Sequence, residues 1–100
     1  METKYTQGPW TVDPSEARAM SGERIFKVIA DRPYGGLIAD VSAWWVDTES
    51  ARNNSRLIAA APDLLAALEM ASRIIAKGGS ITGSQIEIID SALAKAKGDA

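Results

Sequence analysis

Acidic side chains are the main groups in this sequence that could carry out chemistry. The chain has 13 aspartates and glutamates, 11 lysines and arginines, and neither histidine nor cysteine. The lack of these two residue types removes the commonest general base, the thiolate nucleophile and every zinc site built on nitrogen or sulfur ligands. Paired carboxylates could still hydrolyse a glycoside or hold a metal ion, but the acids here are scattered singly. We therefore expect a protein that is not an enzyme, with no catalytic, metal-binding or cofactor-binding residues.

A glycine-rich stretch at residues 78–84 is the second candidate, because a glycine turn that leads into a helix can hold a phosphate. It lacks the G-x-G-x-x-G spacing, the G-K-[S/T] ending and the preceding strand that accompany phosphate-binding loops. The simpler interpretation is a connection at which one helix stops and the next begins. Binding of a small ligand or nucleotide by this loop, with Arg73 nearby, is an alternative.

Basic residues occur in two pairs with a spacing of four, Arg52 with Arg56 and Arg73 with Lys77. Such pairs are typical of a solvated helix face, where nearby acids such as Glu49 act as partners. The net charge of −2 gives no attraction to nucleic acid or anionic lipid. No apolar run approaches the roughly 20 residues of a membrane span. We therefore expect neither direct nucleic-acid binding nor membrane insertion, and the lack of cysteine favours the cytoplasm.

A small fold has to position these residues, because 100 residues with 46% hydrophobic content make one domain with a modest core. Apolar alternation predicts three strands at about 10–13, 24–31 and 37–46, and the segment 14–22 is an irregular connection. In the second strand, Phe26, Val28 and Ala30 form the inner face.

Charge and hydrophobicity predict how the second and third strands pair. Placing Ile29 opposite Ile38 puts Lys27 opposite Asp40 on the outer face, which is a favourable cross-strand pair. A slip by one residue would turn every side chain to the wrong face. The same register pairs apolar residues on the inner face, Val28 with Ala39 and Phe26 with Val41.

Helix signals divide the rest of the chain. We predict helices at about 49–60, 62–77 and 84–97, with Asp47 or Thr48 capping the first. Pro62 separates the first two helices, because proline is tolerated in a first turn and disfavours helical backbone at the residue before it. Ser84 and Glu87 have the spacing of a capping box. The order indicates an α+β fold, a three-stranded antiparallel β-meander followed by three helices packed on one face.

Trp44 and Trp45 are the most unusual feature of the predicted strands, because two adjacent tryptophans on a strand cannot both enter the same core. Adjacent strand residues point to opposite faces, so the alternation predicts Trp45 inward with Leu37 and Val41, and Trp44 outward. The outer face is then more apolar than a monomer normally exposes. Either the chain itself covers this face, through the segment 14–22 or a helix, or the face binds a partner with Trp44 as the anchor. The candidate partner-binding residues are Trp44, Ile25, Ile29, Ile38, Lys27 and Asp40, with Tyr34 in the loop between the strands.

The segment from Asn54 to Leu68, NSRLIAAAPDLLAAL, resembles the NARLIAAAPELLEAL segment of small phage and prophage proteins. Many of these proteins also carry Gly-Pro-Trp near the N-terminus, as Gly8-Pro9-Trp10 does here, with a strand pair between the two motifs. The match covers roughly a fifth of the chain, and Ser55 stands where alanine is usual. The resemblance implies an accessory phage protein that acts in the cytoplasm of a bacterium.

Small phage proteins without catalytic groups often block host defences by binding, and inhibitors of CRISPR–Cas are the best-known class. By analogy of profile, the leading hypothesis is a phage accessory protein that inhibits a host defence component through protein–protein contact. Its partner would be a host protein or complex, such as a CRISPR–Cas component. The alternatives are a small-ligand or nucleotide sponge, and a structural or regulatory phage protein that forms a homodimer.

Overall fold

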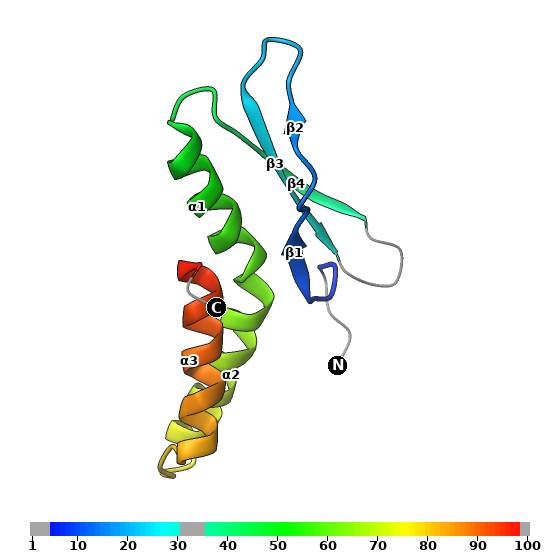
Figure 1. The fold of residues 1–100 in the computed structure, drawn as a ribbon. Helices are drawn as coiled ribbons and strands as arrows, with labels where there is room; N and C mark the ends of the chain where they lie inside the picture. Colours follow the sequence, from blue (N-terminus) through cyan, green and yellow to red (C-terminus); the bar gives the residue numbers. More distant parts are fainter. Residues whose placement is uncertain (1–4, 31–35, 99–100) are drawn as a thin grey trace.

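A computed structural model describes residues 5–30 and 36–98 and shows a sheet followed by three helices (Figure 1). The strands are β1 (Trp10–Val12), β2 (Ala17–Arg18), β3 (Arg24–Ala30) and β4 (Leu37–Ser42). All pairs are antiparallel: β1 and β2 lie one after the other along one edge of β3, and β4 pairs with the other edge. The α+β fold is confirmed, with four strands in place of the three predicted.

The extra strand arises because the first edge is interrupted. Pro14 has no N–H to donate to a ladder, and the Asp13 carboxylate accepts hydrogen bonds from the N–H and hydroxyl of Ser15 at 2.9 and 2.8 Å. This turn takes the chain out of the sheet, and residues 17–18 return to pair with β3. The prediction of an irregular connection over 14–22 is therefore corrected at β2.

The register of β3 and β4 confirms three predicted pairs: Lys27 with Asp40, Val28 with Ala39 and Phe26 with Val41. The predicted pairing of Ile29 with Ile38 is wrong, because a bulge after Val28 places Leu37 opposite Ile29. The bulge coincides with a hydrogen bond from the Ala30 N–H to the Gly36 carbonyl at 2.8 Å. Directly opposed residues share a face, so Leu37 joins Ile29 on the outer face, where the sequence had placed Leu37 inward.

The strand β4 ends at Ser42, four residues before the predicted end. Its partner β3 begins at Arg24, and the last ladder contact is the Ala43 N–H to the Arg24 carbonyl at 2.9 Å. Because β3 begins at Arg24, it does not pair with the residues after Ala43, and the Ser42 hydroxyl accepts from the Trp44 N–H at 3.1 Å.

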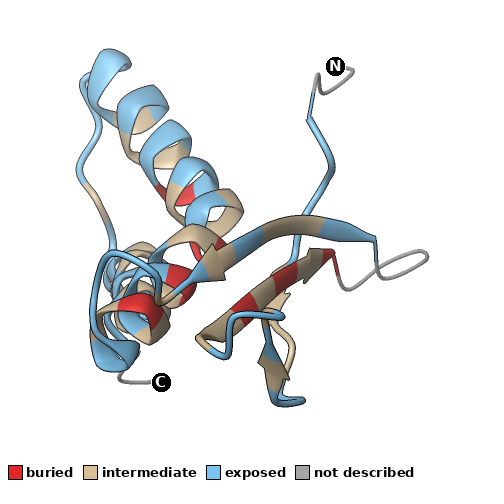
Figure 2. Cartoon of the chain, turned by 90° about the horizontal axis from the view of Figure 1, so that it is seen from above, coloured by how far each residue is buried: buried red, intermediate tan, exposed pale blue. Residues whose placement is uncertain are grey.

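The core lies between the inner face of β3 and α1 (Thr48–Ala59). Phe26, Val28 and Ala30 are buried as predicted, and β3 alternates between buried and intermediate positions in Figure 2. Small side chains on α1 allow it to lie close to the sheet; Ala51, Ser55 and Ala59 are its buried residues. The buried Ser55 hydroxyl donates to the Arg52 carbonyl at 2.6 Å, so its polar group is satisfied. Asp47 caps α1, accepting the Ser50 N–H at 2.6 Å.

The proline joint is confirmed as a break between α1 and α2 (Ala61–Ala76), and the chain bends there (Figure 1). The joint lies one residue earlier than predicted, because Ala61 is already helical and Ala60 is the residue that separates the helices. Ala60 has φ −82 and ψ −6, and its N–H still donates to the Arg56 carbonyl at 3.0 Å. The end of α2 matches the prediction: Lys77 is the C-cap and Gly78 has a left-handed φ of 76°.

The third helix, α3, spans Gly83–Lys97 and uses a different capping box from the predicted Ser84–Glu87 pair. The hydroxyl of Thr82 accepts the Gln85 N–H at 3.4 Å, and Gln85 Oε1 accepts the Thr82 N–H at 2.8 Å. Thr82, and not Ser84, caps the helix because it is the residue with extended backbone directly before the helix.

The helices do not cover the sheet as a layer, so that prediction is corrected. The helix that packs on the sheet is α1, whereas α2 and α3 pack on each other and α3 also packs on α1. The longest strand, of 7 residues, spans about 23 Å. The 12 and 16 residues of α1 and α2 extend about 42 Å. The helices therefore run past the sheet (Figure 1), and the molecule measures 54 × 28 × 19 Å.

Candidate partner-binding surface

The outer face is the side of the sheet that points away from α1. On β3 it consists of Ile25, Lys27 and Ile29, each half-buried, alternating with the buried inner residues. The exposed Asp40 lies opposite Lys27 on β4. The connection at 14–22, which was one candidate to cover this face, instead supplies β2 at the sheet edge.

Two apolar residues complete the far end of this face. Leu37 is exposed and lies opposite Ile29, and Ile38 is half-buried at the bulge. The bulge therefore adds an exposed leucine that the predicted register had assigned to the core. Tyr34, the remaining predicted contact residue, lies outside the described residues.

The tryptophan pair, Trp44 and Trp45, lies between β4 and α1. Trp44 is 55% exposed and Trp45 is 89% exposed, and their rings meet edge to face with centroids 6.0 Å apart. The prediction that Trp45 points into the core is wrong, because β4 has ended by Ser42 and strand alternation no longer applies. Ser42 pairs with Ile25, so the tryptophan pair follows the Ile25 end of the outer face.

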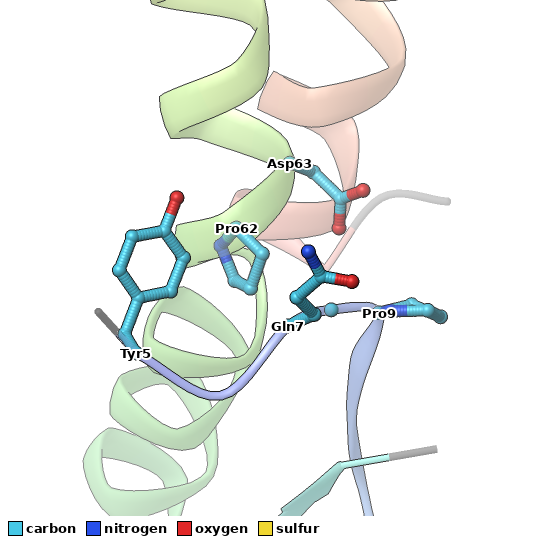
Figure 3. Close-up of a pocket in the computed structure, with 6 residues that line it drawn as sticks. Tyr5, Gln7, Pro9, Pro62 and Asp63 are labelled. Carbon is cyan, nitrogen blue, oxygen red and sulfur yellow. The ribbon is translucent and has the colours of Figure 1, made fainter. Parts of the chain in front are cut away.

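Sequence reasoning missed a packing contact between the two motifs of the resemblance. A Cβ atom built on Gly8 would lie 2.7 Å from Cβ of Pro62. Around this contact Tyr5, Gln7, Pro62 and Asp63 line an open hollow of about 470 Å³ (Figure 3). The separate Gly-Pro-Trp and Ala-Pro-Asp motifs thus meet in space, and their joint occurrence was the signal that could have indicated this contact.

A second hollow, of about 280 Å³, lies at the edge of the interface between α1 and the sheet. Three arginines line it: Arg24, Arg52 and Arg56. The guanidinium groups of Arg24 and Arg52 lie 4.7 and 5.6 Å from the ring centroid of Phe26, a distance at which cation–π attraction operates. Arg52 pairs with Glu49 at 2.8 Å, as predicted for a solvated helix face, while Arg24 Nε is buried and has no hydrogen-bond partner among the described residues. These arginines cover the core residue Phe26, which is a packing role.

The glycine-rich loop at 78–84 connects α2 and α3, as predicted. Its helix-starting N–H groups at Thr82 and Gln85 are taken by the capping box, which leaves fewer donors for a phosphate. Half-buried Asp63 and Lys95 form an ion pair at 2.6 Å that ties α2 to α3.

The part of the chain that the structure describes contains neither a metal-binding cluster nor a membrane-spanning helix. Among residues 5–30 and 36–98, no three acidic side chains gather where a metal ion could be held. In the same part of the chain, none of the helices has the length and apolar character needed to cross a membrane.

Comparison with curated proteins and with solved structures gives no match. The model of a phage protein family, described as Salmonella phage P22 protein Y8K6, matches residues 1–100. This match confirms the resemblance to small phage proteins, and the chain belongs to this family.

Proposed function

We propose that this protein is a non-enzymatic accessory protein of a phage that acts by binding another protein. The observation that carries the proposal is the exposure of the tryptophan pair, with Trp45 at 89%. Tryptophan is among the residues most enriched in binding hot spots. The proposed contact surface is the tryptophan pair together with the outer face beside it.

The energy available from such a contact is large. A tryptophan that becomes buried removes on the order of 150–250 Å² from water. At about 25 cal/mol per Å² this amounts to about 3–6 kcal/mol for Trp45 and about 2–3 kcal/mol for Trp44, which is already partly covered, before the costs of association. The half-buried Ile25 and Ile29 and the exposed Leu37 extend the apolar area, and the opposed Lys27 and Asp40 supply polar positions for orientation.

For the partner, we propose a component of a bacterial defence system, such as a CRISPR–Cas complex. Membership of a phage protein family supports a role during infection. The lack of histidine and cysteine removes the commonest general base and the thiolate nucleophile, which favours inhibition by binding over inhibition by a reaction. Inhibition would result because this surface covers the functional site of the partner.

The test compares the wild type with the double variant Trp44→Ala/Trp45→Ala in bacteria whose CRISPR–Cas system targets an infecting phage. The wild type should restore plaque formation and capture a defence protein from the lysate, and the double variant should lose both. Met20→Ala is the matched control, because Met20 is fully exposed at the β2–β3 turn. Restoration of plaques by the double variant at the wild-type level would refute the proposed surface. If the wild type protects the phage from none of the defence systems tested, the proposed partner class is refuted.

A further inference from the structure

The paired helices α2 and α3 carry apolar stripes that the sheet does not cover. On α2 the stripe is Leu64, Leu68, Ala71 and Ile75, with spacings of four, three and four residues. On α3 it is Ile86, Ile89 and Leu93, with spacings of three and four. Alternating steps of three and four are the pattern of a helix that packs against other helices along a seam.

These stripes lie side by side and open to solvent. Leu64, Leu68 and Ala71 share with Ile89 and Leu93 an apolar groove of about 250 Å³. Leu68 is 68% exposed and Ile75 is 65% exposed. Together the two stripes form what we name the helical seam, which lies on α2 and α3 and is separate from the tryptophan pair on the β4–α1 connection.

The chain as a whole exposes more surface than a compact monomer of its mass. The chain exposes 7010 Å², whereas a folded monomer of 10.6 kDa exposes about 5,500 Å². Its radius of gyration is 15.8 Å, compared with about 13 Å for a compact domain of this length. The excess of about 1,500 Å² is larger than the roughly 800 Å² that each partner contributes to a standard interface.

We propose that a second copy of this chain docks on the helical seam, so that two α2–α3 hairpins form a four-helix bundle. A two-helix hairpin with both apolar stripes on one side is half of such a bundle. A twofold axis would bring each stripe against its symmetry mate, because an isologous interface uses the same patch on both copies. The seven seam positions carry no charge, so close approach of two identical seams leaves no like charges buried.

The test is the mass of the full-length protein in solution, measured by sedimentation equilibrium over a range of concentrations. The wild type should have twice the chain mass of 10.6 kDa. Leu68→Glu should raise the dimer dissociation constant by at least about 100-fold, because the symmetric interface then contains two buried, unpaired carboxylates. Ile88→Glu is the matched control: Ile88 is 52% exposed on α3 but lies outside the seam, so this variant should remain dimeric.

Amide hydrogen exchange on the wild type keeps the test independent of how the variants fold. Dilution should increase exchange in the seam segments of α2 and α3 and leave β2 and the tryptophan pair unchanged. A wild-type monomer at all concentrations would overturn the proposal, as would equal dissociation of Leu68→Glu and Ile88→Glu, or a stable dimer of Leu68→Glu. Protection confined to the outer face of the sheet would place the second copy there and equally overturn it.

Discussion

The contact between Gly8 and Pro62 leads to a sharp prediction for Gly8→Ala. The added methyl group would lie 2.7 Å from Pro62 Cβ and 3.1 Å from its Cγ. Neither atom can rotate away, because the ring is fixed to the backbone of the first turn of α2. Relief therefore requires the segment around Gly8 to move off α2, and with it the adjoining Trp10, whose indole N–H donates to the Thr6 carbonyl at 3.1 Å.

The expected size follows from two opposing terms. Overpacking of this kind costs about 1–3 kcal/mol. Replacement of glycine by alanine returns about 0.4–1 kcal/mol by restricting the unfolded chain. With the middle value of each range, the net destabilisation is about 1.3 kcal/mol. In a domain of about 100 residues this lowers the midpoint of thermal unfolding by about 5–10 °C.

Gly36→Ala is the matched control, because a Cβ built on Gly36 meets no atom of the described residues within 4 Å. Thermal and urea unfolding, followed by tryptophan fluorescence, should show Gly8→Ala destabilised and Gly36→Ala equal to or slightly more stable than the wild type. The reasoning would be refuted if the two variants had the same unfolding free energy.

Two further predictions concern electrostatics. Lys95→Met should destabilise the fold by about 0.5–1 kcal/mol, because it removes the 2.6 Å ion pair with half-buried Asp63. Lys97→Met, in the last turn of the same helix, should change stability less. Equal urea midpoints of the two variants would contradict a stabilising role for the Asp63–Lys95 pair. Hydrogen bonds from Ser50 lower the pKa of Asp47, and hydrogen bonds from Ser15 lower the pKa of Asp13. Since these carboxylates bind protons more weakly in the folded chain than in the unfolded one, their stabilisation is complete above the unfolded pKa. It is lost as the pH falls through about 4 toward the folded pKa. Asp47→Asn, which keeps a capping oxygen, should unfold at nearly the wild-type temperature at pH 7 and lose less stability on acidification, so an unchanged acid profile would argue against the cap.

Elements with local signals were predictable from the sequence. Asp47, Pro62 and Gly78 mark helix ends through their own backbone and side-chain preferences, and each acts at or beside the place predicted. The pairing of Lys27 with Asp40 followed from charge and alternation, which are properties of two short segments. The Thr82–Gln85 capping box was missed because Thr82 and Ser84, two residues apart, could both cap α3, and the backbone conformation before the helix decides between them.

The candidate surface depended on features that single segments do not contain. Trp45 is exposed because β3 starts at Arg24 and leaves the end of β4 without a partner. Leu37 reaches the outer face because a bulge shifts the register. Both outcomes depend on where a neighbouring strand begins or ends, which alternation within one strand cannot indicate.

Residue types and nearest neighbours were sufficient to predict three of the four strands, the three helices and most of the helix ends. Which apolar stripes are covered depends on how these elements pack in space. Leu64, Leu68 and Ile75 have the spacing of core residues, yet the sheet is too short to reach them. Whether an apolar face becomes core or interface depends on the relative lengths and directions of the packed elements, and these are properties of the assembled fold.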